Sequence, residues 1–348
     1  MTKQVFAGSV PIGGGAPVSI QSMTNTDTRD AEKTLAQICA LDSAVCDIVR
    51  VSVYDDLCAD SVRTLVDQSP VPLVADIHFD HRLAIRSIEN GIAKVRINPG
   101  NIGGEEHVKE LADCLKMHRV PVRIGVNSGS LEKDLLDRYG GPVPKALVES
   151  ALGHARLLEK SGFDDLVLSM KASNVRDTVE AARLASGMCS YPLHIGVTEA
   201  GTPGMGSVKS AIGIGALLLD GIGDTVRVSL TGDPVNEVYA AKDILKAVGL
   251  RNEGIDIISC PTCGRTCIDV EGIARRVEAA TRGIRANLTV AVMGCVVNGI
   301  GEGRHADIGI AGGKDGGVLF AKGRPPRKVA GDLADELIRE IRIFAGEA

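Results

Sequence analysis

Two spacings of hydrophobic residues alternate along most of this chain. From residue 18 to about residue 245, short runs rich in β-branched residues are separated by longer segments with apolar residues at helical spacing. The runs predict eight strands: 18–23, 48–53, 72–78, 94–99, 121–127, 166–171, 193–199 and 225–230. The segments between them predict helices, among them 31–44, 82–89, 105–117 and 177–186.

Eight βα units in this length favour an α/β fold in which a (β/α)8 TIM barrel closes on itself. An open, doubly wound sheet has similar local patterns and is the alternative. A glycine-rich segment before the first unit, 10–16, could form a hairpin across the barrel floor.

A second, smaller domain follows a weakly helical linker at 246–254. Its pattern predicts a strand at 255–259, a helix at 270–282, a strand at 288–293, two short strands near Ile308 and Val318, and a final helix from about Val329. We therefore expect a TIM-barrel domain over 1–248 and an α+β domain over 254–348.

Composition narrows the class of protein. Aromatic residues make up 3% of the chain and Trp is absent, so Val, Ile, Leu and Ala must fill the core, as suits parallel strands covered by helices. A net charge of −5 argues against a general nucleic-acid binder. Apolar runs are shorter than the roughly 18 residues that span a membrane, and the start lacks the shape of a signal peptide. We expect a cytoplasmic protein.

Three cysteines and one glutamate in the second domain carry the strongest chemical signal. Cys260 and Cys263 form a C-x-x-C pair after the first strand, Cys295 follows the second strand, and Glu302 lies in a glycine-rich loop. Thiolates at this spacing hold a soft metal or an iron-sulfur cluster, and a carboxylate can complete the site as an exchangeable ligand. Structural zinc is the main alternative, with Cys267 as a further thiolate.

A second group of polar residues falls at the carboxyl ends of the predicted barrel strands, where barrel enzymes have their active sites. Because side chains alternate along a strand, four pairs each share a face: Arg96 with Asn98, Arg123 with Asn127, Ser169 with Lys171, and Arg227 with Ser229. Several cations at one opening predict a ligand that carries phosphates. The alternative is that some of them face outward or pair with Asp76, Glu199 or Asp233. The acid-base candidates are Asp76, His78, His194 and Glu199.

With these motifs in order, the chain resembles the 4-hydroxy-3-methylbut-2-enyl diphosphate synthases, iron-sulfur enzymes of the non-mevalonate isoprenoid pathway, in their bacterial two-domain form. The matching segments span the whole length: 19–25, 75–79, 95–101, 123–130, 194–201, 259–265 and 293–299. One departure is Ile300, where many relatives have Pro, and another is Cys267, which matches no family ligand.

The resemblance implies a reductive activity, in which 2-C-methyl-D-erythritol 2,4-cyclodiphosphate is opened and dehydroxylated to 4-hydroxy-3-methylbut-2-enyl diphosphate. It implies that a 4Fe-4S cluster is held by Cys260, Cys263, Cys295 and Glu302, and that Glu302 also takes part in catalysis. The residues that would bind the substrate are Arg96, Asn98, Arg123, Asn127, Lys171, Arg227, Ser229, Asp76 and His78. Glu199 is the expected proton-transfer residue.

The resemblance further implies a flavodoxin or ferredoxin as electron donor and a head-to-tail homodimer in which one subunit's small domain caps the partner's barrel. A monomer that closes on itself stays open as an alternative. Two other functions also stay open from the residues alone. One is a non-redox barrel enzyme with a structural zinc domain, and the other is an electron-transfer or scaffold protein with an inert barrel.

Overall fold

The computed structural model describes residues 1–97, 103–297, 301 and 303–347, and the chain divides into two compact units, Met1–Leu250 and Arg251–Ala348. Two of the predicted site residues, Asn98 and Glu302, lie outside the described residues. None of the helices within these ranges is long and apolar enough to cross a membrane.

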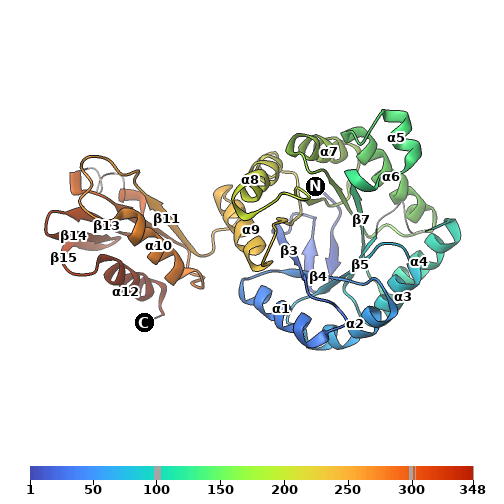
Figure 1. Cartoon of the computed structure of the whole chain (residues 1–348), viewed down its shortest axis with the longest axis horizontal. Coiled ribbons are helices and arrows are strands. Elements are labelled where there is room, and N and C mark those ends of the chain that lie inside the picture. The colour runs from blue at the N-terminus through green and yellow to red at the C-terminus, as the bar shows by residue number, and fades with distance from the viewer. Residues whose placement is uncertain (98–102, 298–300, 302, 348) are drawn as a thin grey trace. The chain divides into compact units, whose positions relative to one another are not determined.

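The first unit is a barrel of parallel strands surrounded by helices (Figure 1). The strands are β3 (Ser19–Met23), β4 (Ile48–Ser52), β5 (Leu73–Ile77), β6 (Lys94–Ile97), β7 (Val122–Asn127), β8 (Leu166–Lys171), β9 (His194–Ile195) and β10 (Thr225–Val226). They run in the order β8-β7-β6-β5-β4-β3-β10-β9, and a parallel bridge between Leu168 and Leu193 joins the two ends of this order. The prediction of a (β/α)8 barrel is confirmed, and the open-sheet alternative is wrong.

Helices follow the strands around the barrel. They are α1 (Ala31–Ser43), α2 (Asp56–Gln68), α3 (His81–Glu89), α4 (Glu105–His118), α5 (Lys133–Tyr139), α6 (Pro144–Lys160), α7 (Val175–Met188), α8 (Pro203–Leu219) and α9 (Val235–Ala247). Several begin at a residue whose side chain accepts a backbone N–H of the first turn, as Asp30 does for α1 and Asp55 for α2. Such a cap typically stabilises a helix by about 1 kcal/mol. The four helices named from periodicity are present, with ends shifted by at most two residues.

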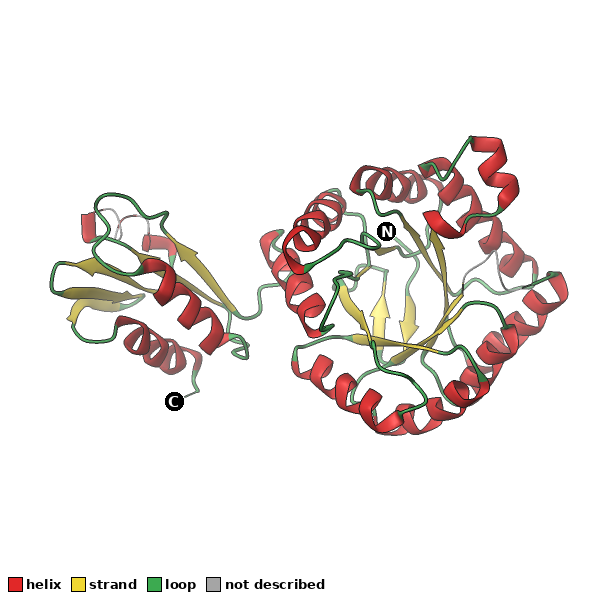
Figure 2. Ribbon diagram, in the orientation of Figure 1, coloured by secondary structure: helices red, strands yellow, loops and turns green. Residues whose placement is uncertain are grey.

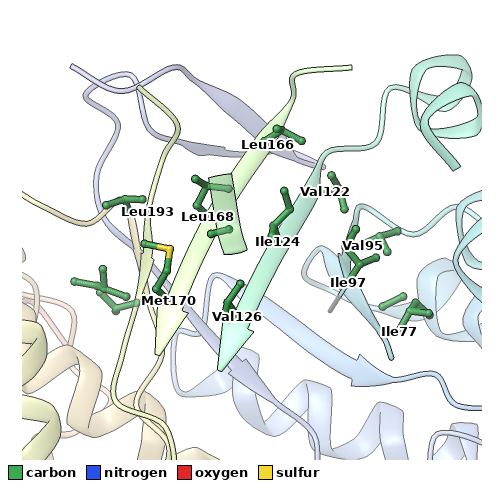
Figure 3. Close-up of a cluster of buried hydrophobic side chains, with 14 of the residues drawn as sticks. Ile77, Val95, Ile97, Val122, Ile124, Val126, Leu166, Leu168, Met170 and Leu193 are labelled. Atoms are coloured by element: carbon green, nitrogen blue, oxygen red, sulfur yellow. The ribbon is translucent and has the colours of Figure 1, made fainter. Parts of the chain in front are cut away.

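Side chains alternate between the two faces of the barrel wall. Figure 3 shows Val122, Ile124 and Val126 of β7 within a cluster of buried apolar side chains, and this cluster continues into the covering helices. Because successive strand residues point to opposite faces, Arg123 and Asn127 face the barrel interior. The strand pattern therefore puts the apolar residues against the helices and the polar residues inside the barrel.

The last two barrel strands are shorter than the predicted runs. β9 and β10 each have two residues in the regular ladder. Beyond them the two backbones approach so closely that a Cβ on Gly196 would lie 2.2 Å from the carbonyl oxygen of Arg227. The chain then turns through a left-handed conformation at Glu199 (φ 51°). The close approach of the two backbones and the turn at Glu199 end the regular pairing of β9 with β10. The residue types in these runs did not indicate such an early end.

A hairpin of β1 (Val5–Ala7) and β2 (Val10–Ile12) lies before the barrel. Val5, Ala7 and Ile12 form an apolar cluster with barrel residues that include Ile48 and Val74, near the amino ends of their strands. The predicted hairpin over 10–16 is therefore misplaced. Gly13, Gly14 and Gly15 all have positive φ, which ends the second strand instead of forming one.

The second unit has one mixed sheet with two helices against it (Figure 2). The strands are β11 (Ile255–Ser259), β12 (Leu288–Met293), β13 (Ile308–Gly313), β14 (Gly316–Ala321) and β15 (Arg324–Val329), paired in that order, and the helices are α10 (Val270–Thr281) and α12 (Leu333–Ala345). The first three strands are parallel and the last two antiparallel to their neighbours.

The sequence did not predict β15. Pro325 and Pro326 argue against a strand because proline has no N–H for a sheet ladder, but β15 is the edge strand of this sheet, where such residues are tolerated. The final helix begins later than predicted, at Leu333, because the carboxylate of Asp332 accepts N–H bonds from Ala334 and Asp335 at its start.

Candidate functional site

Five cations from the strands gather near the opening of the barrel. They are Arg50 of β4, Arg96 of β6, Arg123 of β7, Lys171 of β8, and Arg227 just after β10. Arg96 and Arg123 are register partners on neighbouring strands, and Arg123 is only 2% exposed. The predicted cationic opening is therefore present, with Arg50 as an additional member.

Asp76 of β5 is a carboxylate at the centre of this group. Its oxygens lie 2.9 Å from Nη1 of Arg96 and 3.7 Å from Nε of Arg50. Burial would raise the pKa of Asp76, but Arg50, Arg96 and Arg123 together lower it to about 2. Asp76 is therefore ionised at neutral pH, where it orients two guanidinium groups, and it cannot serve as an acid there.

His78, an exposed residue just after β5, lies next to the same arginine. Its Nε2 is 2.7 Å from Nη1 of Arg96. Because a guanidinium only donates hydrogen bonds, His78 must accept with an unprotonated Nε2. Burial and neighbouring arginines lower the pKa of His78 in spite of Asp76, in agreement with a neutral ring. In this geometry His78 orients Arg96.

Arg227 pairs with a residue that the sequence did not single out. Glu237 of α9 lies 3.2 Å from Nη2 of Arg227 and also accepts bonds from the hydroxyl of Ser22 and the backbone N–H of Leu230. The sequence-based alternative named Asp233 as a possible partner for a cation here. Glu237 is almost fully buried on a helix, and the packing of α9 against β3 brings it to Arg227.

Positive charge exceeds negative charge on this inner surface, and part of it has no partner. Among the described residues, Nε and Nη2 of Arg123 and Nε of Arg96 are buried without a hydrogen-bond partner. Burial and neighbouring cations hold the pKa values of Arg123 and Lys171 well below their usual range. Buried donors without acceptors cost free energy, so the arrangement is suited to an anionic ligand with several oxygen acceptors.

A further polar layer lies inside the barrel. Lys94 is completely buried, and its Nζ, both ring nitrogens of His194 and both side-chain polar atoms of Gln21 lack hydrogen-bond partners among the described residues. Lys94 precedes Arg96 by two positions on the same face of β6. His194, predicted as an acid-base candidate, is therefore a core residue, and burial followed by nearby cations, Lys171 first among them, holds its pKa well below the usual range.

Arg50, Lys94 and Glu237 are the main residues that the sequence analysis missed. Arg50 and Lys94 carry a usable signal, because a charged residue within a short β-branched run must face either solvent or a polar interior. Arg96 and Arg123 were identified instead by their place near the carboxyl ends of predicted barrel strands. Glu237 carries none, since a glutamate in a helix ordinarily faces solvent.

The other predicted barrel residues lie around the opening. Asn127 ends β7 and is the register partner of Lys171, and Ser229 is half-buried after β10. Glu199 is exposed after β9, in the left-handed conformation that non-glycine residues rarely adopt. Such strain is typical of functional positions.

The three predicted cysteine ligands follow the carboxyl ends of two adjacent parallel strands. Ser259 of β11 is in register with Val292 of β12, so Cys260 and Cys295 leave the sheet at the same edge. The backbone N–H of Gly294 lies 3.1 Å from Sγ of Cys260. Such N–H···S contacts favour a thiolate and are one of the means by which a protein adjusts a bound cluster.

Cys263 lies in the exposed turn that follows. The backbone N–H of Arg265 lowers the pKa of the Cys263 thiol, which favours the ligating thiolate. Cys267 is also exposed, and its thiol donates to the carbonyl oxygen of Arg265 at 3.3 Å.

The donor set fits an iron-sulfur cluster in its chemistry, because three thiols not joined in disulfides lie on loops at one sheet edge. Across the ranges described, no group of three or more His, Cys, Asp or Glu side chains is already drawn together as a metal site. The fourth predicted ligand, Glu302, belongs to the part of the chain outside those ranges.

Comparisons with known proteins cover both units. The GcpE TIM-barrel domain matches residues 2–242, and the GcpE protein C-terminal domain matches residues 256–343. The 4-hydroxy-3-methylbut-2-en-1-yl diphosphate synthase (flavodoxin) of Caldanaerobacter subterraneus subsp. tengcongensis is 57% identical over 348 residues, covering 100% of this chain and 98% of the relative. The protein of the same name from Geobacter sulfurreducens is 56% identical and covers 99% of this chain and 98% of its own.

A more distant likeness concerns the barrel fold alone. The DAHP synthase of Thermotoga maritima has a TM-score of 0.50 at 10% identity and covers 71% of this chain and 72% of its own. Family matches in both units, and identity above one half over the whole length, confirm the resemblance inferred from the motifs. The chain belongs to the GcpE family, with that family's barrel domain followed by its C-terminal domain.

Proposed function

We propose that this protein converts 2-C-methyl-D-erythritol 2,4-cyclodiphosphate to 4-hydroxy-3-methylbut-2-enyl diphosphate by reductive ring opening and dehydroxylation. The observation that carries the proposal is the surplus of buried guanidinium groups in the barrel, whose free donors are suited to the oxygens of a diphosphate. The names of the relatives, which specify the diphosphate product, support the same activity.

In this proposal Arg96, Arg123 and Lys171 bind the diphosphate directly, with Arg50 and Arg227 beside them. Asp76 and His78 hold Arg96 in its orientation through bonds of 2.9 Å and 2.7 Å. The remaining polar contacts come from Asn98, Asn127 and Ser229. Because these cations are already oriented, few side chains must reorient when the ligand binds, which lowers the free-energy cost of reaching the reacting geometry.

The cysteines and one carboxylate form the second half of the proposed site. Cys260, Cys263, Cys295 and Glu302 would hold a 4Fe-4S cluster in the domain over 254–348. When bound, the cluster would supply electrons one at a time and an iron position that a substrate oxygen can occupy in place of the carboxylate. Gly294 and Arg265 support the ligating thiolates by N–H bonds to Cys260 and Cys263.

Proton transfer is assigned to Glu199. Its carboxylate belongs to an exposed residue at the carboxyl end of β9, next to the cationic opening. The left-handed backbone there is an uncommon conformation that must be held by its surroundings. A carboxyl group at such a position can give the proton that the departing hydroxyl needs to leave as water.

The substrate site and the cluster site belong to different domains, 1–248 and 254–348 in the proposed division, so they must meet over the substrate. We infer that they meet in a head-to-tail homodimer, each small domain capping the partner's barrel. Exposed apolar residues beside both sites support closure: Phe79 after β5 is 76% exposed, and Val297 after Cys295 is 68% exposed. Burying such side chains would stabilise a closed state.

The relatives' names specify flavodoxin, so we propose a flavodoxin as the electron donor, with a ferredoxin as the alternative. A donor of this kind belongs to the cytoplasm, which is the compartment we propose for this protein.

Anaerobic purification followed by metal analysis tests the proposal. We expect a brown protein that dithionite bleaches and that converts the cyclodiphosphate with reduced flavodoxin. A colourless protein with stoichiometric zinc and no turnover would refute it.

Two variants then separate the ligands. Cys295→Ser should lose the cluster, because a serine hydroxyl is a poor ligand for iron-sulfur iron. Glu302→Ala should keep much of the cluster but lose turnover, because three thiolates remain. Equal loss of iron and sulfide in both variants would give Glu302 a structural role only.

A further inference from the structure

The charges on the inner surface of the barrel can be compared with those of the ligand. Around the opening, the described residues include four guanidinium groups, from Arg50, Arg96, Arg123 and Arg227, and two carboxylates that pair with them, from Asp76 and Glu237. Lys94 and Lys171 are further buried cations on the inner faces of β6 and β8, and Glu199 is an exposed carboxylate after β9. The cyclodiphosphate is a dianion, because each phosphorus has a single ionisable oxygen and its other oxygens are esterified, doubly bonded or shared in the anhydride.

The ligand's charge changes during the proposed reaction. One carbon–oxygen bond of a phosphoester breaks, and the oxygen stays on the diphosphate as a new ionisable group with a pKa of about 6. The balanced equation is substrate dianion, two electrons and one proton giving product trianion and water. The product therefore has one more negative charge than the substrate, and the same set of barrel cations must hold it.

Lys171 is placed to respond to this change. It is 7% exposed on the inner face of β8, and its Nζ lies 3.1 Å from where a Cβ on Gly196 would be. Five neighbouring elements present charged or titratable groups to it: Arg123 from β7, Arg96 from β6, Arg50 from β4, Arg227 after β10, and His194 from β9. Two buried carboxylates, Asp76 of β5 and Glu237 of α9, are already paired with arginines, and a third carboxylate, Glu199 after β9, is exposed.

This setting disfavours a charged amine until more negative charge arrives. Burial, followed by Arg123, Arg227, Arg50 and Arg96, holds the pKa of Lys171 well below its usual range. A bound dianion offsets part of this effect, and a trianion offsets more.

We propose that Lys171 is uncharged in the free enzyme and takes up one proton from solvent when the trianionic product forms, so that the charge of the barrel rises with that of the ligand. The inference rests on the proposed function and adds a proton uptake that the balanced equation does not contain. Product should consequently bind more tightly as pH falls, to a greater extent than substrate does.

Calorimetry on the oxidised holoenzyme tests the proposal without turnover. Binding of the cyclodiphosphate and of the product is measured at about pH 8, above the terminal phosphate pKa of about 6, in Tris and in HEPES. The difference in heat between the buffers gives the protons taken up. We expect product to bind with about one proton more than substrate does.

Two variants assign that proton. Lys171→Met should abolish the difference and weaken product binding more than substrate binding, whereas Lys171→Arg should abolish the difference and retain affinity. Equal uptake for both ligands in the wild type would overturn the proposal, as would a difference that persists in both variants, since the proton would then lie on the ligand or another group. Failure of both ligands to bind would refute the proposed function instead.

Discussion

Arg123 lies on the inner face of β7 with two guanidinium nitrogens that have no hydrogen-bond partner in the described structure. Its immediate charged neighbours include Arg50 and Arg96 as well as Asp76. A buried cation beside two other cations lowers the stability of the folded protein, and a bound anion offsets that loss. The same residue therefore opposes stability in the free enzyme and supports ligand affinity.

Arg123→Met should separate these two effects. We expect unfolding in urea to show a free enzyme stabilised by about 1 to 4 kcal/mol, because a similar volume is filled without a charge. The KM for the cyclodiphosphate should rise about 10- to 100-fold, since charged hydrogen bonds contribute about 1.5 to 3 kcal/mol. Arg82→Met, at an exposed position on α3, is the control and should change neither quantity. An unchanged KM in Arg123→Met would remove Arg123 from the substrate site.

Asp76 gives a prediction about pH. Its pKa is lowered from an ordinary 3.8 to about 2 in the folded protein. A lowered carboxyl pKa contributes stability above the ordinary value, and this contribution disappears as pH falls toward the folded value. Asp76 should thus account for about 2 kcal/mol of stability that is lost between about pH 4 and pH 2.

Urea unfolding from about pH 5 to pH 2 measures this contribution. Asp76→Asn should be destabilised by about 3 to 5 kcal/mol at neutral pH, because it leaves buried arginines unpaired, and the gap to wild type should narrow toward pH 2. Asp67→Asn, at an exposed position of α2, should follow the wild type throughout. A constant gap between Asp76→Asn and wild type would contradict the lowered pKa.

At the scale of elements, β13 packs closely against the loops that carry the cysteines. A Cβ on Gly312 would lie 2.5 Å from the carbonyl oxygen of Gly294, next to Cys295. The same carbonyl accepts the backbone N–H of Cys267 at 2.9 Å. Glycine at position 312 is therefore needed for the loop that carries Cys295 to pack as it does.

Gly312→Ala should displace this loop and reduce the iron and sulfide retained per chain after anaerobic purification, with a loss of stability of about 1 to 3 kcal/mol. Gly313→Ala is a matched control, because a Cβ there meets only an ordinary contact of 3.5 Å. Equal cluster content in the two variants would show that the loop adapts to the added methyl group.

Helices and strands were predicted best where a single local sequence pattern determines their structure. The helices of the barrel follow apolar spacing, and β3 to β8 follow β-branched runs, so both were found in the sequence. β15 was missed because its prolines are tolerated only at a sheet edge, and the edge is a property of the assembled sheet. The shortness of β9 and β10 likewise depends on a backbone contact between Gly196 and Arg227.

At the scale of the whole molecule, the proposed homodimer predicts complementation between inactive variants. Cys295→Ser disables the cluster site, and Arg123→Met leaves little turnover at the barrel site when the substrate concentration is held well below the raised KM of this variant. If each active site joins two chains, a heterodimer of these variants contains one intact site, from the barrel of one chain and the small domain of the other.

An equimolar mixture with random exchange should recover about a quarter of wild-type turnover, because about half of the dimers are heterodimers and each has one of two sites intact. Unmixed variants are the control. No recovery after exchange, verified by mass spectrometry of differently tagged chains, would indicate that the site closes within one chain.

The sequence by itself determined the barrel, the second domain and the residue types of both sites, because strand and helix periodicity and cysteine spacing are local properties that residue order preserves. It also indicated Arg96, Arg123, Lys171, Arg227, Asp76 and His78, which the structure brings together. Tertiary structure alone decided the partners: Glu237 reaches Arg227 from a helix, His78 accepts from Arg96, and His194 is enclosed in the core. Pairing and burial depend on distances between segments far apart in the chain, and such distances exist only once the barrel has closed.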